Sequence, residues 1–407
     1  MSDTQYEVIV FGASSFVGQI ICEYLSSYRG EESPLRWAMA GRNERKLQET
    51  RDALSGDKPD LLIADSSDEV SLRAMAAKAQ VVLSTVGPYA LYGEALVKVC
   101  AETGTDYCDL TGEVHWIRAM IDRYQTTASQ SGARLVHCCG FDSIPSDLGV
   151  LFTQTHFRER YGHPSEDIRM RVKAAKGGLS GGTFASLLNV MKEASEDPAL
   201  RKQMADPYLL CPGAGFHGRQ RNPGLAELDV ISGRWMSPFI MAAINTRVVQ
   251  RSHYLLGKAY GDHFRYEETM LTGTGLAGRL RASAIGGSLA AFMLGAAIKP
   301  GRWLLEKLLP APGEGPSPEA QQKGFFDMRF YALSGNGKTL QCKVTGDRDP
   351  GYGATAKMIS QAALCLARDV NESQCAGGSW TPASSMGVTL MQRLEQHAGM
   401  QFAVVEE

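Results

Sequence analysis

The stretch FGASSFVG occupies residues 11–18, between an apolar run and a helical pattern. The preceding residues, YEVIVFG, are typical of a short buried strand. After the stretch, apolar residues recur at spacings of three and four, which predicts an amphipathic helix; they are Val17, Ile20, Ile21, Tyr24, Leu25 and Tyr28. FGASSFVG is therefore a strand-to-helix turn close to the start of the chain.

This turn has the features of a phosphate-binding turn. Free N–H groups at a helix N-terminus favour a pyrophosphate. Gly12 permits the sharp turn, and Gly18 lets helix and strand pack closely. Ser15 stands where many such turns have a glycine; its N–H and hydroxyl can donate to phosphate, at a steric cost if the position needs a positive φ. The alternative is a glycine turn without a ligand. The expected contacts are Gly12, Ala13, Ser14, Ser15, Phe16, Val17 and Gly18.

The end of the second predicted strand, AGRNERK, indicates which dinucleotide binds. An acidic residue at this place holds the ribose of NAD, whereas an arginine accommodates the 2′-phosphate of NADP. Arg42 stands there, and a cation at a helix N-terminus is favoured only with a compensating anion. We therefore expect NADP(H), with a solvated basic helix start as the alternative. Asp65, after the third strand, is expected to accept from the adenine amino group; a plain turn aspartate is an equal alternative.

The fourth predicted strand ends in STVGPY, residues 84–89. Ligands of open α/β sheets bind at the carboxyl ends of the strands. Thr85, Val86, Gly87 and Pro88 are therefore expected near the nicotinamide ribose. A strand-ending Gly-Pro turn without a ligand is the alternative.

Strands and helices alternate regularly over the first 140 residues, which predicts a parallel sheet with helices on both faces. The fold class is α/β, a Rossmann-type doubly wound domain over residues 1–145. The rhythm then changes, and alternating apolar and polar residues predict a second, α+β domain over 146–350 with a largely antiparallel sheet. Its predicted strands are DIRMRVKAA, DHFRYEETM, FFDMRFYAL and TLQCKVTGD, and PAPGEGPSP (310–318) is a predicted linker.

Composition narrows the class of protein. The 407 residues carry a net charge of −2, which gives no footprint for nucleic acid. Nine scattered cysteines without a C-x-x-C pair indicate reduced thiols in the cytoplasm. No His/Cys pattern indicates a metal site. The polar N-terminus gives no sign of a signal peptide.

One apolar segment, ASAIGGSLAAFMLGAAI at 282–298, lies between Arg281 and Lys299. A spanning helix needs about 20 strongly apolar residues. This segment is shorter and rich in Gly, Ala and Ser, so we expect a buried or interfacial helix. A peripheral contact with the inner face of the plasma membrane would then run through 282–298.

Seven motifs in order resemble the saccharopine-dehydrogenase-like oxidoreductases, in the branch that holds the mycobacterial trans-acting enoyl reductase. They are GASSFVG, WAMAGRNERKL, STVGPY, YCDLTGE, GFDSIPSDLG, GGLSGGT and GGSWTPASSMGVTLMQRL. The resemblance implies an NADP-type Rossmann domain, an α+β domain, and a C-terminal segment, 351–407, whose helices return to the first domain. It also implies reduction of a carbon–carbon double bond in a polyketide-derived lipid precursor.

The expected function is therefore NADPH-dependent reduction of an unsaturated, lipid-like acyl substrate. The long loops of the second domain and the segment 282–298 are rich in Gly, Ala, Met and Phe, which fits a hydrophobic substrate better than the dicarboxylate of true saccharopine enzymes. Reduction of a C=N bond in an amino-acid adduct is one alternative. A membrane-surface protein that binds NADPH without turnover is another, and a homodimer remains open.

Reduction of an enoyl group needs a proton donor. The candidates at the sheet's carboxyl edge are Tyr89, Tyr107, Asp109, Asp142 and Ser143. Asp142 and Ser143 open the connection between the domains and are the first choice. The alternative is that Asp142 caps the helix that begins near Pro145. Asp109 is equally well explained as a loop brace.

Overall fold

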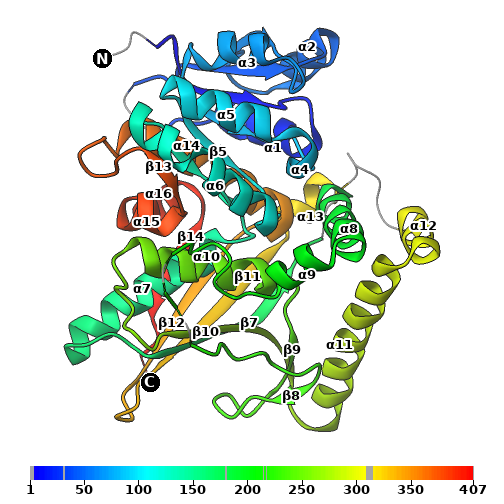
Figure 1. Cartoon of the computed structure of the whole chain (residues 1–407), viewed down its shortest axis with the longest axis vertical. Coiled ribbons are helices and arrows are strands. Elements are labelled where there is room, and N and C mark those ends of the chain that lie inside the picture. Colours follow the sequence, from blue (N-terminus) through cyan, green and yellow to red (C-terminus); the bar gives the residue numbers. More distant parts are fainter. Residues whose placement is uncertain are drawn as a thin grey trace.

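Two seven-stranded sheets organise the chain, one near the blue N-terminal end of Figure 1 and one below it. The structure, a computed structural model, describes residues 4–30, 33–178, 181–213, 215–216, 218–308 and 315–406. Both sheets take a strand from the C-terminal segment, so the two halves of the fold share one chain end.

The first sheet is parallel throughout, in the order β13-β6-β5-β4-β1-β2-β3. The predicted Rossmann-type fold is confirmed. Strands β2 and β3 lie to one side of β1, and β4, β5, β6 and β13 lie to the other, which makes the β1/β4 boundary the switch point where such sheets bind ligands. The strands are β1 (Tyr6–Phe11), β2 (Trp37–Gly41), β3 (Asp60–Ile63), β4 (Ala79–Ser84), β5 (Asp106–Asp109), β6 (Arg134–Val136) and β13 (Gly378–Trp380).

Helices cover both faces of this sheet. They are α1 (Phe16–Ser26), α2 (Glu44–Ala53), α3 (Glu69–Ala76), the short α4 (Tyr89–Tyr92), α5 (Glu94–Thr103) and α6 (Val114–Ser131). Gly104 and Gly132 end α5 and α6 with φ of 75° and 89°. This left-handed conformation favours glycine, which is why both helices end at these residues.

The second sheet is mixed and largely antiparallel, as predicted; only β7 and β10 pair in parallel. Alternate residues of β11 and β12 are buried, and that face packs against α7 (Ile144–Tyr161). The order is β14 (Met400–Val404), β12 (Thr339–Gly346), β11 (Phe325–Leu333), β7 (Asp167–Lys176), β10 (Arg265–Gly273), β9 (Trp235–Pro238) and β8 (Glu227–Leu228).

The C-terminal segment contributes to both sheets. Helix α14 (Thr355–Arg368), which follows the π-helical turn η1 (Pro350–Ala354), packs against α1 and β4. Strand β13 then extends the first sheet, α15 (Pro382–Ser385) and α16 (Gly387–His397) follow, and β14 closes the second sheet. The guanidinium of Arg134 joins this segment to β6 through a 2.8 Å bond to the Leu366 carbonyl.

The apolar segment 282–298 lies within α11 (Gly275–Ala297), which extends along the margin of the molecule with α12 (Lys299–Leu308) at its end (Figure 1). Only 17% of its most apolar window is buried, so of the two expected alternatives the buried helix is wrong, while the interfacial helix stays a prediction. By length and composition alone, α11 could cross a membrane. Most of the predicted linker, 310–314, lies outside the described residues. The remaining helices are α8 (Gly181–Glu196), α9 (Pro198–Met204), α10 (Ala242–Leu255) and α13 (Pro318–Gln322).

Candidate active site

The ends of β1, β2 and β4 meet at one edge of the first sheet. The Gly12 N–H donates to the Ala40 carbonyl at 2.9 Å, and the Thr85 N–H donates to the Phe11 carbonyl at 2.9 Å. These bonds hold the three predicted cofactor-binding segments side by side at the switch point of the sheet.

Both glycines of the first turn are required by its geometry. Gly12 has a φ of +88°, and a Cβ there would lie 2.6 Å from Thr85 Oγ1. A Cβ on Gly18 would lie 2.2 Å from the Gly12 carbonyl oxygen. Gly12 therefore makes the turn, and Gly18 lets α1 pack directly onto it, as the sequence indicates.

Ser15 fits the turn in an ordinary conformation. Its φ is −70°, so the position carries no steric cost for a side chain. The Ser15 N–H donates to the Gly12 carbonyl at 2.9 Å, and the Ser15 hydroxyl accepts from the Gly18 N–H at 3.0 Å. The hydroxyl also lies 3.0 Å from Thr85 Oγ1. Both Ser15 groups thus act within the turn as a helix N-cap.

The free donors of the turn are backbone groups. Within the described residues, no partner is recorded for the N–H groups of Ser14, Phe16 and Val17. They lie at the first turn of α1, where the helix dipole favours an anion. These three donors are the ones that fit a pyrophosphate. The Phe16 ring packs edge-on against Tyr352, at 4.8 Å between centroids, so the π-helical turn η1 borders the site.

Arg42 lies exposed at the end of β2, and it has no ion-pair partner within the described part of the chain. The neighbouring Arg45 is already paired with Glu49 at 2.7 Å. Asp65 accepts from the Ser67 N–H at 2.9 Å and from the Ser67 hydroxyl at 2.8 Å, and these bonds lower the pKa of its carboxyl. Asp65 thus closes its own turn, while the free guanidinium of Arg42 fits a ribose phosphate.

The fourth strand end is braced by Glu113. Its carboxylate accepts from the N–H groups of Tyr89 (2.9 Å) and Ala90 (2.8 Å) at the start of α4, and from the Ser186 hydroxyl of α8 (2.9 Å). The turn before α4 contains a cis peptide between Gly87 and Pro88, while Thr85 and Val86 are partly exposed. This contact brings α8, which begins within the glycine-rich GGLSGGT motif, to the cofactor edge.

The side chains of two predicted proton donors, Tyr89 and Asp109, are fully hydrogen-bonded within the fold. The buried Tyr89 hydroxyl donates to the Ser84 carbonyl and accepts from the Leu110 N–H, and burial raises its pKa well above the usual value. Asp109 is completely buried and accepts four bonds, from Tyr107 Oη, His137 Nδ1 and the N–H groups of Thr111 and Cys138. This is the geometry of a loop brace.

Asp142 differs from the other candidates. Asp142 is half-buried as a residue, and within the described residues no hydrogen-bond partner is recorded for its carboxyl. Burial raises its pKa to about 7. Asp142 follows β6, whose carboxyl end lies at the same sheet edge as the turn, and the Cys139 N–H of this connection donates to the Asp109 carbonyl at 2.7 Å. The N-cap position of α7 belongs to Ser143, so Asp142 does not cap that helix through its side chain.

Ser143 belongs to a buried polar cluster behind the site. Its hydroxyl donates to Asn245 Oδ1 at 3.0 Å, and Asn245 Nδ2 donates to Glu268 at 2.9 Å. Tyr266 Oη also donates to Glu268 at 2.7 Å. Burial raises the pKa of Glu268 to about 7. Sequence reasoning missed Asn245 and Glu268, because their partners lie far away along the chain.

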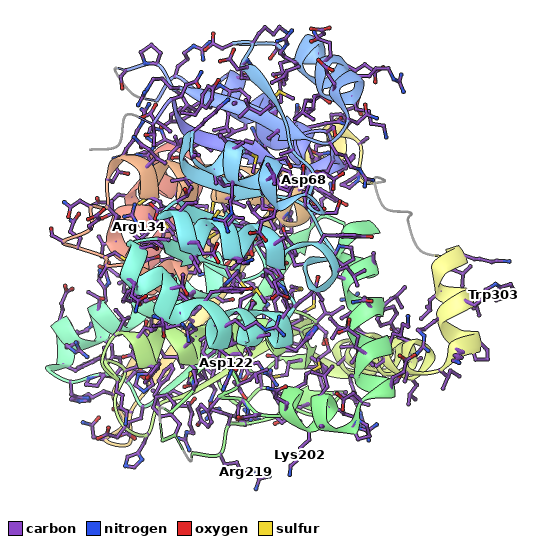
Figure 2. The ribbon with its side chains drawn as sticks, turned by 45° about the horizontal axis from the view of Figure 1, so that its top comes forward. Asp68, Asp122, Arg134, Lys202, Arg219 and Trp303 are labelled. Carbon is purple, nitrogen blue, oxygen red and sulfur yellow. The ribbon has the colours of Figure 1, made fainter. Side chains whose placement is uncertain are left out.

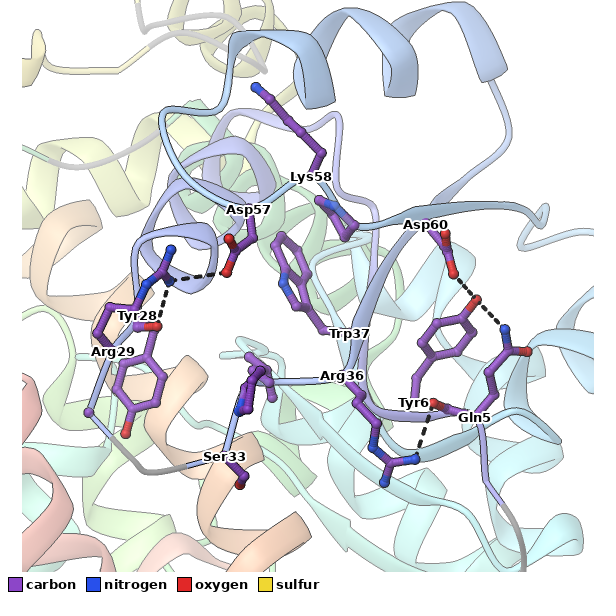
Figure 3. A pocket seen from close by; sticks show the side chains of 14 residues that line it. Gln5, Tyr6, Tyr28, Arg29, Ser33, Arg36, Trp37, Asp57, Lys58 and Asp60 are labelled. Atoms are coloured by element: carbon purple, nitrogen blue, oxygen red, sulfur yellow. Dashed lines mark hydrogen bonds and ion pairs between the residues drawn. The ribbon is translucent and has the colours of Figure 1, made fainter.

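One described cavity, of about 740 Å³, lies at the opposite edge of the first sheet. It is lined by residues at and just before the starts of β1, β2 and β3, including Tyr6, Trp37 and Asp60 (Figure 3). Ion pairs and hydrogen bonds already join its walls, among them Arg29 with Asp57 at 3.2 Å. Ligands of such sheets bind at the carboxyl ends, so this cavity is separate from the cofactor edge.

Comparison with known proteins agrees with this site. Residues 8–136 match the family described as the saccharopine dehydrogenase NADP-binding domain. The matched range contains all three strand ends and Arg42. The first domain is thus an NADP-binding domain, in agreement with the free guanidinium at the end of β2.

Relatives of full length were also found. A Mycobacterium tuberculosis protein, whose name assigns it provisionally to the trans-acting enoyl reductases, is 40% identical over 96% of this chain and 95% of its own length. The trans-acting enoyl reductase of Mycobacterium bovis BCG is 37% identical over 97% and 96%. Saccharopine dehydrogenase (L-Glu forming) of Saccharomyces cerevisiae matches in fold, with a TM-score of 0.55 at 12% identity over 98% of this chain and 100% of that one.

Proposed function

Because the chain belongs to the saccharopine-dehydrogenase-like oxidoreductases, in the branch of the mycobacterial trans-acting enoyl reductases, we propose that this NADP-dependent oxidoreductase reduces the carbon–carbon double bond of an unsaturated acyl substrate. One observation carries the proposal. Asp142, a carboxyl without a hydrogen-bond partner among the described residues and with a pKa of about 7, lies at the same sheet edge as the NADP-binding turn.

Each group at this edge has a distinct task. When bound, NADPH supplies a hydride. The N–H groups of Ser14, Phe16 and Val17 hold its pyrophosphate, and Arg42 holds the 2′-phosphate. Asp142 holds the proton that the α carbon needs once the β carbon has been reduced, and solvent then restores that proton. A pKa near 7 suits this task, because the acid is both populated and a ready donor at neutral pH.

Two observations support a hydrophobic substrate. The full-length relatives are named for enoyl reduction. In addition, Arg171 and Arg251, two basic residues of the second domain, are committed elsewhere. Arg171 is completely buried and pairs with Asp229 and Glu267, while Arg251 donates to the carbonyls of Leu210 and Ser379. These two cations do not serve a dicarboxylate substrate. The apolar segment 282–298 gives no support, since it lies on the exposed α11.

The test compares substrate classes. Oxidation of NADPH is followed with a 2-enoyl thioester of long chain, a 2-enoyl thioester of short chain, and a mixture of a keto acid and an amine. The proposal predicts turnover with the enoyl thioesters, with the higher kcat/KM for the long chain. Turnover with the keto acid and amine alone would assign the saccharopine-type reaction instead. Tight NADPH binding without turnover of any class would favour a non-catalytic protein.

A further inference from the structure

Helices α11 and α12 form a projection, termed here the arm, that covers residues 275–308. One face of α11 is apolar and points outward. Leu276, Leu280, Leu294 and the adjoining Ile298 recur at helical spacing, with Gly287 and Ala291 between them, and therefore share a face. Leu276 and Leu294 are 71% and 72% exposed. The buried residues of α11 are small: Gly278, Ala282, Gly286 and Ala296.

The arm is firmly attached to the body in this orientation. A Cβ on Gly286 would lie 2.2 Å from the Leu225 carbonyl oxygen, so α11 contacts the protein body directly at its small residues. Arg302 is buried and donates to the carbonyls of Ala296 and Ala297 at the end of α11, at 3.0 and 3.1 Å, which fixes α12 against α11. Because the opposite face of α11 packs on the protein body, the outward leucines stay exposed.

The second helix continues this outward face. Trp303 is 59% exposed on α12 at the margin of the molecule (Figure 2), and Leu304 and Leu308 are exposed beside it. Lys307 Nζ lies 3.8 Å from the centroid of the Trp303 ring. An amphipathic helix with tryptophan, leucine and lysine on its exposed side is the arrangement that binds at a lipid–water interface.

The charged residues of the arm are mostly basic. Its sequence contains a single acidic residue, Glu306. The basic residues are Arg279, Arg281, Lys299, Arg302 and Lys307, of which all but Arg302 are exposed. Two copies of the chain that paired through this face would bring like charges together. An anionic surface, in contrast, would satisfy the cations and cover the leucines at once.

We propose that the arm docks the protein onto an anionic phospholipid surface, with α11 lying in the plane of the interface. Its outward leucines enter the acyl boundary, Trp303 lies at headgroup level, and the lysines and arginines contact phosphates. A transmembrane orientation does not fit, because the inner face of α11 packs on β9, β10 and α8 of the protein body. The proposal stands independently of the reaction.

The test is co-sedimentation of the full-length protein with phosphatidylcholine vesicles and with vesicles that contain one part phosphatidylglycerol to two parts phosphatidylcholine. Binding is expected to be roughly tenfold stronger to the anionic vesicles and to weaken with salt. The double variant Leu280→Glu/Leu294→Glu is expected to lose roughly tenfold or more of this binding. Lys299→Glu/Lys307→Glu is expected to lose the preference for anionic lipid.

The matched control is Val70→Glu/Val388→Glu, which alters two exposed apolar residues, 77% and 55% exposed, away from the arm. It is expected to bind like the wild type.

Equal binding by the Leu280/Leu294 variant, or no binding to either vesicle, would overturn the proposal. A wild-type dimer that this variant dissociates, without vesicle binding, would assign the face to a second copy. Turnover of a soluble short-chain enoyl thioester is expected to stay unchanged in the Leu280/Leu294 variant, so failure of docking and failure of the reductase proposal are distinguishable.

Discussion

At the residue scale, Ser15 and Arg42 have different relations to the cofactor. The sequence predicts a phosphate cradle around FGASSFVG, and the turn has that geometry. Spacing alone did not reveal that the hydroxyl and N–H of Ser15 both bond within the turn, since that depends on the position of Thr85, which follows the fourth strand. The arginine at the end of β2 did predict NADP, because an exposed cation at that place fits the 2′-phosphate.

Arg42→Ala is expected to weaken NADPH binding roughly 10- to 100-fold, the value of one charged hydrogen-bonding group. NADH binding is expected to change little, since NADH lacks the 2′-phosphate. The measurement is titration of both nucleotides by fluorescence or calorimetry. Arg45→Ala is the matched control, because Arg45 lies nearby but is paired with Glu49. Unchanged NADPH affinity in Arg42→Ala would contradict the assignment.

Asp142→Asn tests the proton donor. Burial raises the pKa of Asp142 to about 7, so the protonated, donating form declines as the pH rises through 7. The wild-type kcat is therefore expected to fall above that pH. The variant is expected to lose about 100-fold in kcat and to lack this pH limb. Asp122→Asn, an exposed acid on α6 that is labelled in Figure 2, serves as the control. A pH limb that survives in Asp142→Asn would exclude Asp142 as the donor.

At the scale of elements, regular patterns were predictable and isolated short elements were not. The strands and helices of the first domain follow from periodicity, and the helix ends from Gly104 and Gly132. Strands β13 and β14 were missed because each gains its stability from a long-range partner: β6 for the one and β12 for the other. The sequence left open whether α11 is buried or interfacial, since apolar composition alone does not distinguish a buried helix from one that faces a partner.

Gly18→Ala tests the packing of α1 on the turn. A Cβ there would lie 2.2 Å from the Gly12 carbonyl oxygen, so the helix must shift. The variant is expected to lose at least about 2 kcal/mol of unfolding free energy, as overpacked sites do, and most of its NADPH affinity. Gly287→Ala is the helical control, because its Cβ would meet nothing within 4 Å. It is expected to be neutral or slightly stabilising. Equal stability of both variants would contradict this account of the turn.

At the scale of the whole molecule, a buried acid ties together helices from distant parts of the chain. Asp147 on α7 accepts from the Ser252 hydroxyl of α10 and from the Ala383 N–H of α15, at 2.8 Å for the latter. Burial raises its pKa to about 7, as it does for Glu268. The motif GFDSIPSDLG contains Asp147 as well as Asp142, and the sequence alone could not separate the residue that ties these helices together from the one proposed as the proton donor.

Glu268→Gln tests the energetic effect of this cluster. The folded protein keeps a proton on Glu268 up to about pH 7, whereas the unfolded chain releases it near pH 4.3. The contribution of Glu268 to the free energy of unfolding is therefore complete below about pH 4.3. It is lost as the pH rises to 7, by up to about 1.4 kcal/mol per pH unit. The variant is expected to lack this contribution to the pH slope in denaturant unfolding at pH 5, 6 and 7, a range chosen to lie within this window, while the similar contributions of Asp142 and Asp147 remain. The exposed Glu49→Gln is expected to keep it. Identical slopes in Glu268→Gln and the wild type would contradict the prediction.

The central claim, that this chain delivers a hydride to an enoyl group, is tested most directly by isotope transfer. NADPH deuterated at the nicotinamide C4 is incubated with the protein and a long-chain 2-enoyl thioester, and the product is analysed by mass spectrometry and NMR. We predict one deuterium at the β carbon of a saturated product, and a proton from solvent at the α carbon. A product without deuterium, or deuterium at an amine-bearing carbon when a keto acid and an amine are supplied, would contradict the account.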